Sequence, residues 1–295
     1  MSPAVSTPCQ VQEHALEGFR FESRLTGWDR QGLPIVLVGG AFQRKESWGR
    51  LEERLIETVP VVTVDLPGWG AADTLPADVG VDFLPSALQE MLRDRGLTRV
   101  KIAAGSYGSA IGYRLAQQRP DLVWRLFLMS TMTRIPESAR DQIEHSLSLL
   151  DRGDLPAFAS TTVSLFMCSD PARRIAHGPV VKRILTTRFT NATPDELEKY
   201  RLNTRRLLDQ DLLCPQPAQS VPTLVVTGEH DDFTRPELCR QVAETCPDSF
   251  FATFRDADHM VHLERTGEVA DLGLRFFHDV PLADLDYCAV TERVN

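Results

Sequence analysis

The sequence has few of the features that mark secreted, membrane or metal-binding proteins. Its 295 residues include six cysteines, which form neither a C-x-x-C pair nor a Cys/His cluster at metal-ligand spacing. We therefore expect reduced thiols, no disulfide framework and no metal site. No run of about 18 apolar residues could span a membrane, and residues 1–10 lack a basic segment followed by an apolar one. These absences predict a cytoplasmic protein without a secretory signal or a membrane partner.

Positive charge is also scarce. The chain has 32 Lys and Arg against 41 Asp and Glu, a formal net charge of −9. Because binding to a phosphate backbone needs a basic footprint, nucleic acid is excluded as a main partner. The charge is uneven, since residues 134–219 carry +1 and the remainder −10. This asymmetry would suit an anionic substrate or an acidic partner, although a solvated helical surface with ion pairs is the simpler interpretation.

Short apolar runs alternate with helical patterns in the first half of the chain. Residues 14–27 alternate apolar and polar side chains, which is typical of a hairpin at a sheet edge. Buried strands are predicted over residues 34–38, 61–64, 100–103 and 123–129, and helices over 46–58, 81–95 and 107–119. This alternation indicates the α/β class, with a mostly parallel sheet and helices on both faces.

The alternation stops after residue 130. Residues 131–220 show helical spacing without a buried strand, so we predict a helical cap inserted between two parts of one core, 1–130 and 221–295. Thr193 and Thr234 each begin a capping-box pattern, T-P-D-E and T-R-P-E. Strands are expected at 221–227 and 250–254 and a last helix at 263–280. The polar tail after Pro281 is expected to be partly disordered.

The stretch V-K-I-A-A-G-S-Y-G-S-A-I-G, residues 100–112, indicates a strand, a sharp turn and a helix with Ser106 at the apex. Such a turn strains the apical serine and brings strand and helix together, so the residues two before and two after it must be small. Ala104 and Gly108 meet this requirement. The geometry would expose the Ser106 hydroxyl as a nucleophile, whereas Ser109 would already lie inside the helix.

A serine nucleophile needs a base, and in a parallel sheet that base must come from the carboxyl ends of the strands. Of the seven histidines, only His230, His259 and His262 lie at or just beyond such ends. His259 is the predicted base because it follows the last predicted strand in a short loop. His262 falls where a helix should begin, and His230 remains a minor rival.

The base in turn needs an acid that fixes its tautomer. Asp231, three residues after Gly228 and just beyond a predicted strand, is the predicted acid. Asp232 and Glu229 are close competitors. The three roles would then occur along the chain in the order serine, acid, histidine.

Five short motifs occur in order along the chain. They are Gly39-Gly40-Ala41-Phe42, Asp65-x-Pro-Gly-x-Gly, Ala104-Gly105-Ser106-Tyr107-Gly108, Gly228-x-x-Asp231 and Asp258-His259-Met260-Val261-His262-Leu263-Glu264. Together they resemble the α/β-hydrolase fold family over residues 20–280. The resemblance implies a Ser106–His259–Asp231 triad and an oxyanion hole made by the backbone amides of Ala41 and Tyr107. Family members that open epoxides or displace halide use aspartate at the nucleophile position, so Ser106 favours acyl transfer.

Two positions depart from the family pattern. Gly39 stands where a histidine is usual in the oxyanion loop, which removes a side chain but leaves the backbone donors. Asp258 stands where glycine usually precedes the base. A carboxylate there could raise the pKa of His259 or make a competing hydrogen bond.

The resemblance leaves several activities open. A serine hydrolase acting on a carboxylic ester or thioester is the main hypothesis, with no cofactor and with Phe42, Phe166 and Met260 in contact with a small acyl substrate. A looser resemblance, in the strings G-A-F-Q-R-K-E-S-W, D-L-P-G-W-G and G-E-H-D-D-F-T, points to hydrolase-fold enzymes that form rhamnolipid precursors. Because of this looser resemblance, an acyltransferase that moves an acyl group from a carrier-protein or CoA thioester to an alcohol remains an alternative. Carbon–carbon bond hydrolysis and non-catalytic ligand binding also remain open, as does the oligomeric state.

Overall fold

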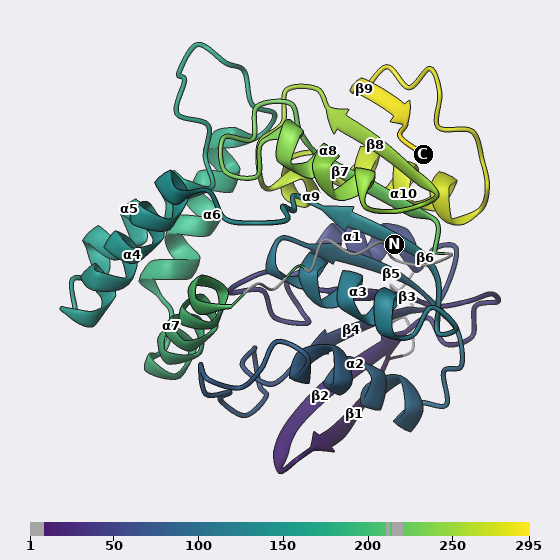
Figure 1. The fold of residues 1–295 in the computed structure, drawn as a ribbon, viewed down its shortest axis with the longest axis horizontal. Coiled ribbons are helices and arrows are strands. Elements are labelled where there is room, and N and C mark those ends of the chain that lie inside the picture. Colours follow the sequence, from purple (N-terminus) through teal and green to yellow (C-terminus); the bar gives the residue numbers. More distant parts are fainter. Residues whose placement is uncertain (1–8, 211–212, 214–220) are drawn as a thin grey trace, which may run out of the picture.

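One nine-stranded sheet runs through the molecule, in the order β1-β2-β4-β3-β5-β6-β7-β8-β9 (Figure 1). The computed structural model describes residues 9–210, 213 and 221–295. The strands are β1 (Cys9–Leu16), β2 (Phe19–Thr26), β3 (Ile35–Val38), β4 (Val61–Asp65), β5 (Val100–Gly105), β6 (Val123–Met129), β7 (Thr223–Gly228), β8 (Ser249–Phe254) and β9 (Cys288–Arg293). The six strands from β4 to β8 in the sheet order are parallel, while β1, β2 and β9 add antiparallel edges. The predicted α/β class is confirmed.

Helices cover both faces of this sheet. Their bounds are α1 (Gly49–Leu55), α2 (Phe83–Asp94), α3 (Tyr107–Gln118), α4 (Glu137–Asp151), α5 (Leu155–Leu165), α6 (Gly178–Thr190), α7 (Pro194–Asp209), α8 (Pro236–Glu244), α9 (Val261–Glu264) and α10 (Thr266–Phe277). Apolar residues of α1 and α10 pack on one face and those of α2, α3 and α8 on the other. The central strands β3, β4, β5 and β7 are buried at every position because both faces are covered.

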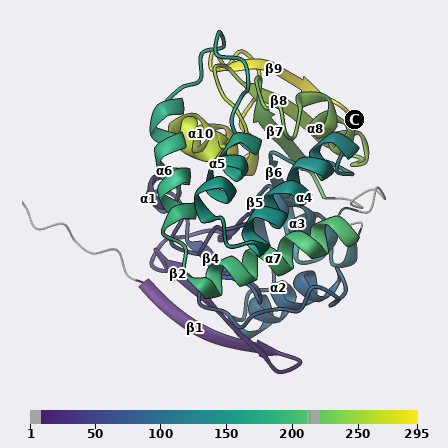
Figure 2. The same ribbon diagram turned by 90° about the vertical axis from the view of Figure 1, so that its left-hand side faces the viewer.

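Helices α4 to α7 stand apart from these two layers, and Figure 2 shows them in front of the sheet. They share a hydrophobic core of their own, in which the Phe158 and Tyr200 rings lie 5.5 Å apart. Phe42, from the loop after β3, inserts into this core and stacks on Tyr200 at 4.3 Å. Thr193 caps α7 through the reciprocal bonds with Glu196 that the sequence predicts. The chain between β6 and β7 therefore contains helices joined by loops, and no strand among its described residues.

Two predictions for the C-terminal part are wrong. The last helix is broken into α9 and α10 at Arg265, whose guanidinium donates to the carbonyl oxygen of Arg255. The tail is not disordered, because β9 pairs antiparallel with β8 along the sheet edge. Among the described helices, none is both long enough and apolar enough to cross a lipid bilayer.

Candidate active site

Ser106 lies at the turn between β5 and α3 with φ +50° and ψ −119°, a strained conformation for a residue with a side chain. Close packing explains the small neighbours: a Cβ on Gly108 would lie 2.4 Å from the carbonyl oxygen of Val38. Ser109 is inside α3, as predicted, and its hydroxyl donates to the carbonyl oxygens of Ala104 and Met129. Of these two serines, only Ser106 faces the cavities described below.

The structure brings the three predicted residues together. The Nε2 atom of His259 lies 3.3 Å from Ser106 Oγ, and its Nδ1 atom lies 3.1 Å from Asp231 Oδ2. Asp231 and His259 are buried, while Ser106 is half-buried. A bond from Nδ1–H to the carboxylate leaves Nε2 as the acceptor that faces the hydroxyl. The arrangement can therefore accept the proton of Ser106.

Asp231 is held as a carboxylate by its neighbours. Both threonine hydroxyls, of Thr227 and Thr234, donate to Oδ2, and the amides of Phe233 and Thr234 donate to Oδ1. Burial opposes ionisation, but His259 and these hydrogen bonds outweigh it and keep the pKa of Asp231 below its ordinary value. The sequence did not single out Thr227 or Thr234 for this role.

Thr234 also corrects a prediction. The T-R-P-E pattern predicts a capping box, but α8 begins after Arg235 without a side-chain cap. The Thr234 hydroxyl instead lies between Asp231 Oδ2 and His259 Nδ1, 3.1 Å from the latter. A buried carboxylate needs donors more than a solvent-exposed helix end does, so the tertiary bond prevails.

The competing residues of the acid turn have other partners. The Asp232 carboxylate accepts from the amide and hydroxyl of Ser169, in the chain between α5 and α6. Glu229 accepts from the amide of Asp256, and His230 lies 3.5 Å from Glu229. Glu229, His230 and Asp256 form one group with metal-ligand spacing in the described residues. Asp256 is also paired with two arginines, Arg174 and Arg265, whose positive charges disfavour a cation there.

The oxyanion loop after β3 is braced by two side chains that the sequence did not reveal. Gln43 Oε1 accepts from the amide of Gly40 at 2.6 Å, and its Nε2 atom lies 3.0 Å from His262. Trp69, from the loop after β4, donates to the carbonyl oxygen of Gly40. Burial, with the nearby His259, lowers the pKa of His262 to about 4, so this ring is neutral at neutral pH and can accept from Gln43. His262 is therefore a bracing residue and not the partner of Ser106.

These braces leave two backbone donors at the expected place. The amides of Ala41 and Tyr107 make no hydrogen bond to other described residues, whereas the amide of Gly40 is occupied by Gln43. Gly39 is required here because a Cβ at this position would lie 2.8 Å from Gln43 Cβ. The glutamine thus fills the space next to the position where the family usually has histidine.

Replacing Gln43 with alanine should lower kcat about tenfold with a smaller effect on KM. The reason is that the Gly40 amide loses its acceptor and the loop that carries the Ala41 amide loosens, which weakens the interaction with the charge formed in the transition state. Steady-state kinetics on any ester substrate would measure this. Gln10→Ala, at an exposed position on β1, is the matched control, and equal kinetics for Q43A and Q10A would contradict the role of Gln43.

Asp258 does not bond to the His259 ring. Its carboxylate accepts from the backbone amides of His259 and Cys168, and so ties the base loop to the chain that follows α5. Its own amide donates to the buried carboxylate of Glu264. Burial and the charge of Asp231 raise the pKa of Asp258 to about 7, and burial with the neighbouring Asp258 and Asp231 charges raises the pKa of Glu264 to about 8.

These raised pKa values predict how stability depends on pH. Between about pH 4.5 and 8 the folded protein keeps a proton on Glu264 that the unfolded chain loses, so stability falls as pH rises through this window. Glu264→Gln keeps an acceptor for the Asp258 amide and cannot ionise. Its Tm should therefore fall less than that of the wild type between pH 6 and 9, by roughly 2 °C or more. Thermal unfolding across pH would show this, with Glu57→Gln as an exposed control; an unchanged pH dependence in E264Q would contradict it.

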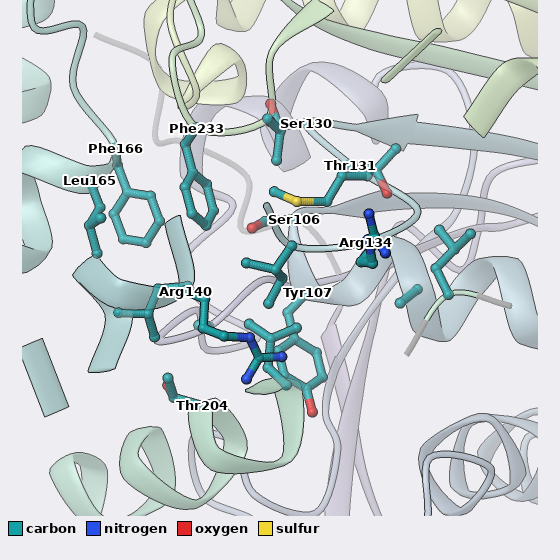
Figure 3. Close-up of a pocket in the computed structure, with 18 of the residues that line it drawn as sticks. Ser106, Tyr107, Ser130, Thr131, Arg134, Arg140, Leu165, Phe166, Thr204 and Phe233 are labelled. Carbon is teal, nitrogen blue, oxygen red and sulfur yellow. The ribbon is translucent and has the colours of Figure 1, made fainter. Parts of the chain in front are cut away.

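Two mainly apolar cavities meet at Ser106. The first, of about 100 Å³, extends from Ser106 toward α4 and α7 (Figure 3), and the second, of about 210 Å³, extends toward α6 and His262. Phe166 lines both and stacks on the His259 ring at 5.1 Å. Phe42 and Met260 line the second cavity. All three residues predicted to contact substrate thus lie on cavity walls beside Ser106.

Residues 34–266 match the family model for the alpha/beta hydrolase fold. Since this span covers most of the chain, the protein belongs to the α/β hydrolase fold family.

Relatives and solved structures agree with this assignment. The chain is 25% identical over 237 residues to (E)-2-((N-methylformamido)methylene)succinate hydrolase of Acinetobacter baylyi, covering 79% of this chain and 86% of the relative. It is 26% identical over 236 residues to pimeloyl-[acyl-carrier protein] methyl ester esterase of Chromobacterium violaceum, covering 78% and 88%. The crystal structure of MGS-M2, an α/β hydrolase enzyme from a deep-sea metagenome library, superposes with a TM-score of 0.81 at 17% identity, over 93% of this chain and all of that one. The structural likeness supports the fold alone.

Proposed function

We propose that the protein is a serine hydrolase that cleaves a carboxylic ester or thioester through an acyl-enzyme intermediate. The observation that carries this proposal is the chain of contacts from Ser106 Oγ through His259 to Asp231, beneath a strained turn and beside two cavities. A serine that is merely part of a turn has no need of a buried histidine and a buried, fully hydrogen-bonded carboxylate.

The geometry supports a two-step reaction. In the first step Ser106 Oγ forms a bond to the substrate carbonyl carbon while its proton passes to His259 Nε2, and the amides of Ala41 and Tyr107 stabilise the oxyanion. The tetrahedral intermediate then breaks its bond to the alcohol or thiol, which takes the proton from His259. In the second step water gives a proton to His259 and attacks the acyl group, and the acid leaves as the proton returns to Ser106.

The comparisons support the hydrolase class of this proposal. The family is a hydrolase fold family, and both relatives named above are described as a hydrolase or an esterase. One acts on an acyl group attached to a carrier protein, as its name says. We infer an acyl substrate of this kind, either free or joined to a carrier protein or CoA. We also infer that the helical segment 131–220 acts as a cap that shapes the two cavities.

A substrate panel tests the proposal. The purified protein would be incubated with p-nitrophenyl esters and acyl thioesters of increasing chain length, with and without an alcohol acceptor, and the products identified by mass. We expect release of the free acid, with rates that depend on acyl length. A new ester in the presence of the alcohol would instead establish acyl transfer, and a folded protein that cleaves no member of the panel would contradict the proposal.

A further inference from the structure

The first cavity is lined by positively charged side chains without negatively charged ones among its described residues. Two arginines, Arg134 and Arg140, line it, and none of the described residues that line it is Asp or Glu. Most of the remaining lining is apolar or hydroxyl-bearing. Arg134 is exposed and Arg140 is partly exposed, so both lie where the cavity opens to solvent. Two guanidinium groups without a carboxylate among the described lining residues favour an anion at this opening, because opposite charges attract.

The two arginines make few hydrogen bonds or ion pairs with other described residues of the protein. Arg134, in the chain between β6 and α4, makes no ion pair with any described residue. Arg140, on α4, donates from Nη2 to the carbonyl oxygen of Leu208 at 2.6 Å, and its Nη1 atom lies 3.9 Å from Glu144. In Figure 3, Arg134 lies on the side of Ser106 opposite Phe166 and Phe233. Arg134 is therefore available to bind a substrate that enters this cavity, while Arg140 is held by Leu208 and adds a positive charge at the cavity wall.

The second cavity offers a contrast. It too is lined by an arginine, Arg188, but this guanidinium lies 2.7 Å from Glu196 and donates to the carbonyl oxygen of Phe42. Arg188 is therefore held against a carboxylate of the protein, which it shares with Arg44. Of these two cavities, the first is the one lined by an arginine, Arg134, that makes no ion pair with a described residue.

The triad geometry indicates which part of the substrate enters which cavity. His259 must donate its Nε2 proton to the leaving alcohol or thiol, so that atom lies on the side of the base. His259 lines the second cavity and is absent from the described lining of the first. The leaving group therefore occupies the second cavity, and the acyl group extends into the first, toward the arginines.

We propose that the acyl group carries a carboxylate bound by Arg134, with Arg140 supplying a second positive charge. The substrates would then be monoesters or monothioesters of dicarboxylic acids. This inference rests on the proposed function and narrows its substrate class. Arginine suits the task because its planar guanidinium can bind both oxygens of a carboxylate.

Two matched substrates test the inference: mono-p-nitrophenyl adipate, with a free terminal carboxylate, and the same compound with that carboxylate methylated. The readout is the ratio of their kcat/KM values. For the wild type we expect a ratio of about ten or more in favour of the free carboxylate, falling as sodium chloride is raised. In Arg134→Gln the ratio should fall about tenfold, and further in the R134Q/R140Q double variant.

Arg183→Gln is the control, since it removes the same charge from an exposed position on α6 outside both cavities. Its ratio should equal that of the wild type. A wild-type ratio of one or less, or an R134Q ratio equal to that of R183Q, would overturn the inference while hydrolysis of the methylated ester leaves the proposed function standing. If neither ester is cleaved and Ser106 does not react with a fluorophosphonate, the proposed function itself fails.

Discussion

Replacing Ser106 with alanine is expected to lower kcat for ester or thioester hydrolysis by roughly 10⁴- to 10⁶-fold. The loss is large because no acyl-enzyme can form once Oγ is absent, and only the oxyanion donors and substrate binding remain to assist water. KM should change little, since the Ser106 hydroxyl is a small part of the cavity wall. Single-turnover and steady-state assays with an activated ester would measure both effects.

Ser109→Ala is the matched control for this prediction. The same atom is removed three residues later on α3, where the hydroxyl donates to the carbonyl oxygens of Ala104 and Met129 and does not face either cavity. We expect S109A to keep most of its activity at temperatures where it is folded. Comparable activity in S106A and S109A would mean that Ser106 is not the nucleophile.

Asp231→Asn should lower kcat by roughly 10⁴-fold. The asparagine amide could donate to His259 Nδ1 and so favour the tautomer with the proton on Nε2, which cannot accept from Ser106. The loss of charge would also remove the group that stabilises protonated His259. Because four donors besides His259 surround the carboxylate, we expect a lower Tm as well, and kcat should be measured well below the unfolding temperature.

Asp232→Asn provides the comparison, because it makes the same chemical change one residue later. Its carboxylate contacts Ser169 and does not contact His259. We expect D232N to retain a kcat close to that of the wild type. The opposite pattern, with an active D231N and an inactive D232N, would transfer the role of the acid to Asp232.

The positions of Ser106, Asp231 and His259 could be predicted because each follows a strand of a parallel sheet. Carboxyl ends of parallel strands meet at one edge, so residues separated by more than a hundred positions come together once the strands are recognised. The strands themselves were recognisable since β3, β4, β5 and β7 are short, mainly apolar segments, which is typical of strands buried on both faces. At Ser106, Asp231 and His259 the local sequence pattern therefore predicts the same positions that the folded sheet brings together.

Features that depend on a distant partner could not be predicted in the same way. Gln43 braces the Gly40 amide together with His262, which is 219 residues away. Thr234 has the local pattern of a helix cap, but the buried Asp231 carboxylate takes its hydroxyl. In each case the sequence offers a side chain with several possible partners, and only the tertiary structure selects one.

The sheet edge, the loop of the base and the first cavity also have features that the sequence alone could not predict. The segment of β9 is half polar and has one buried position, which is why it resembles a loosely ordered tail, yet its backbone pairs with β8. Asp258 could have acted on the ring of His259 or elsewhere, and the structure directs its carboxylate to two backbone amides. The charge count of residues 134–219 left an anionic ligand open beside the simpler interpretation of a solvated helical surface, and it could not show that Arg134 and Arg140 share one cavity.

The most direct test of the account is to react the protein with a fluorophosphonate, digest it and locate the adduct by tandem mass spectrometry. Such reagents modify a serine only when a base activates it and an oxyanion hole receives the developing charge. We predict a single adduct on Ser106 in the wild type, no adduct in S106A, and strongly slowed labelling in His259→Ala. An adduct on another residue, labelling that persists in S106A, or a folded wild-type protein that does not react would contradict it.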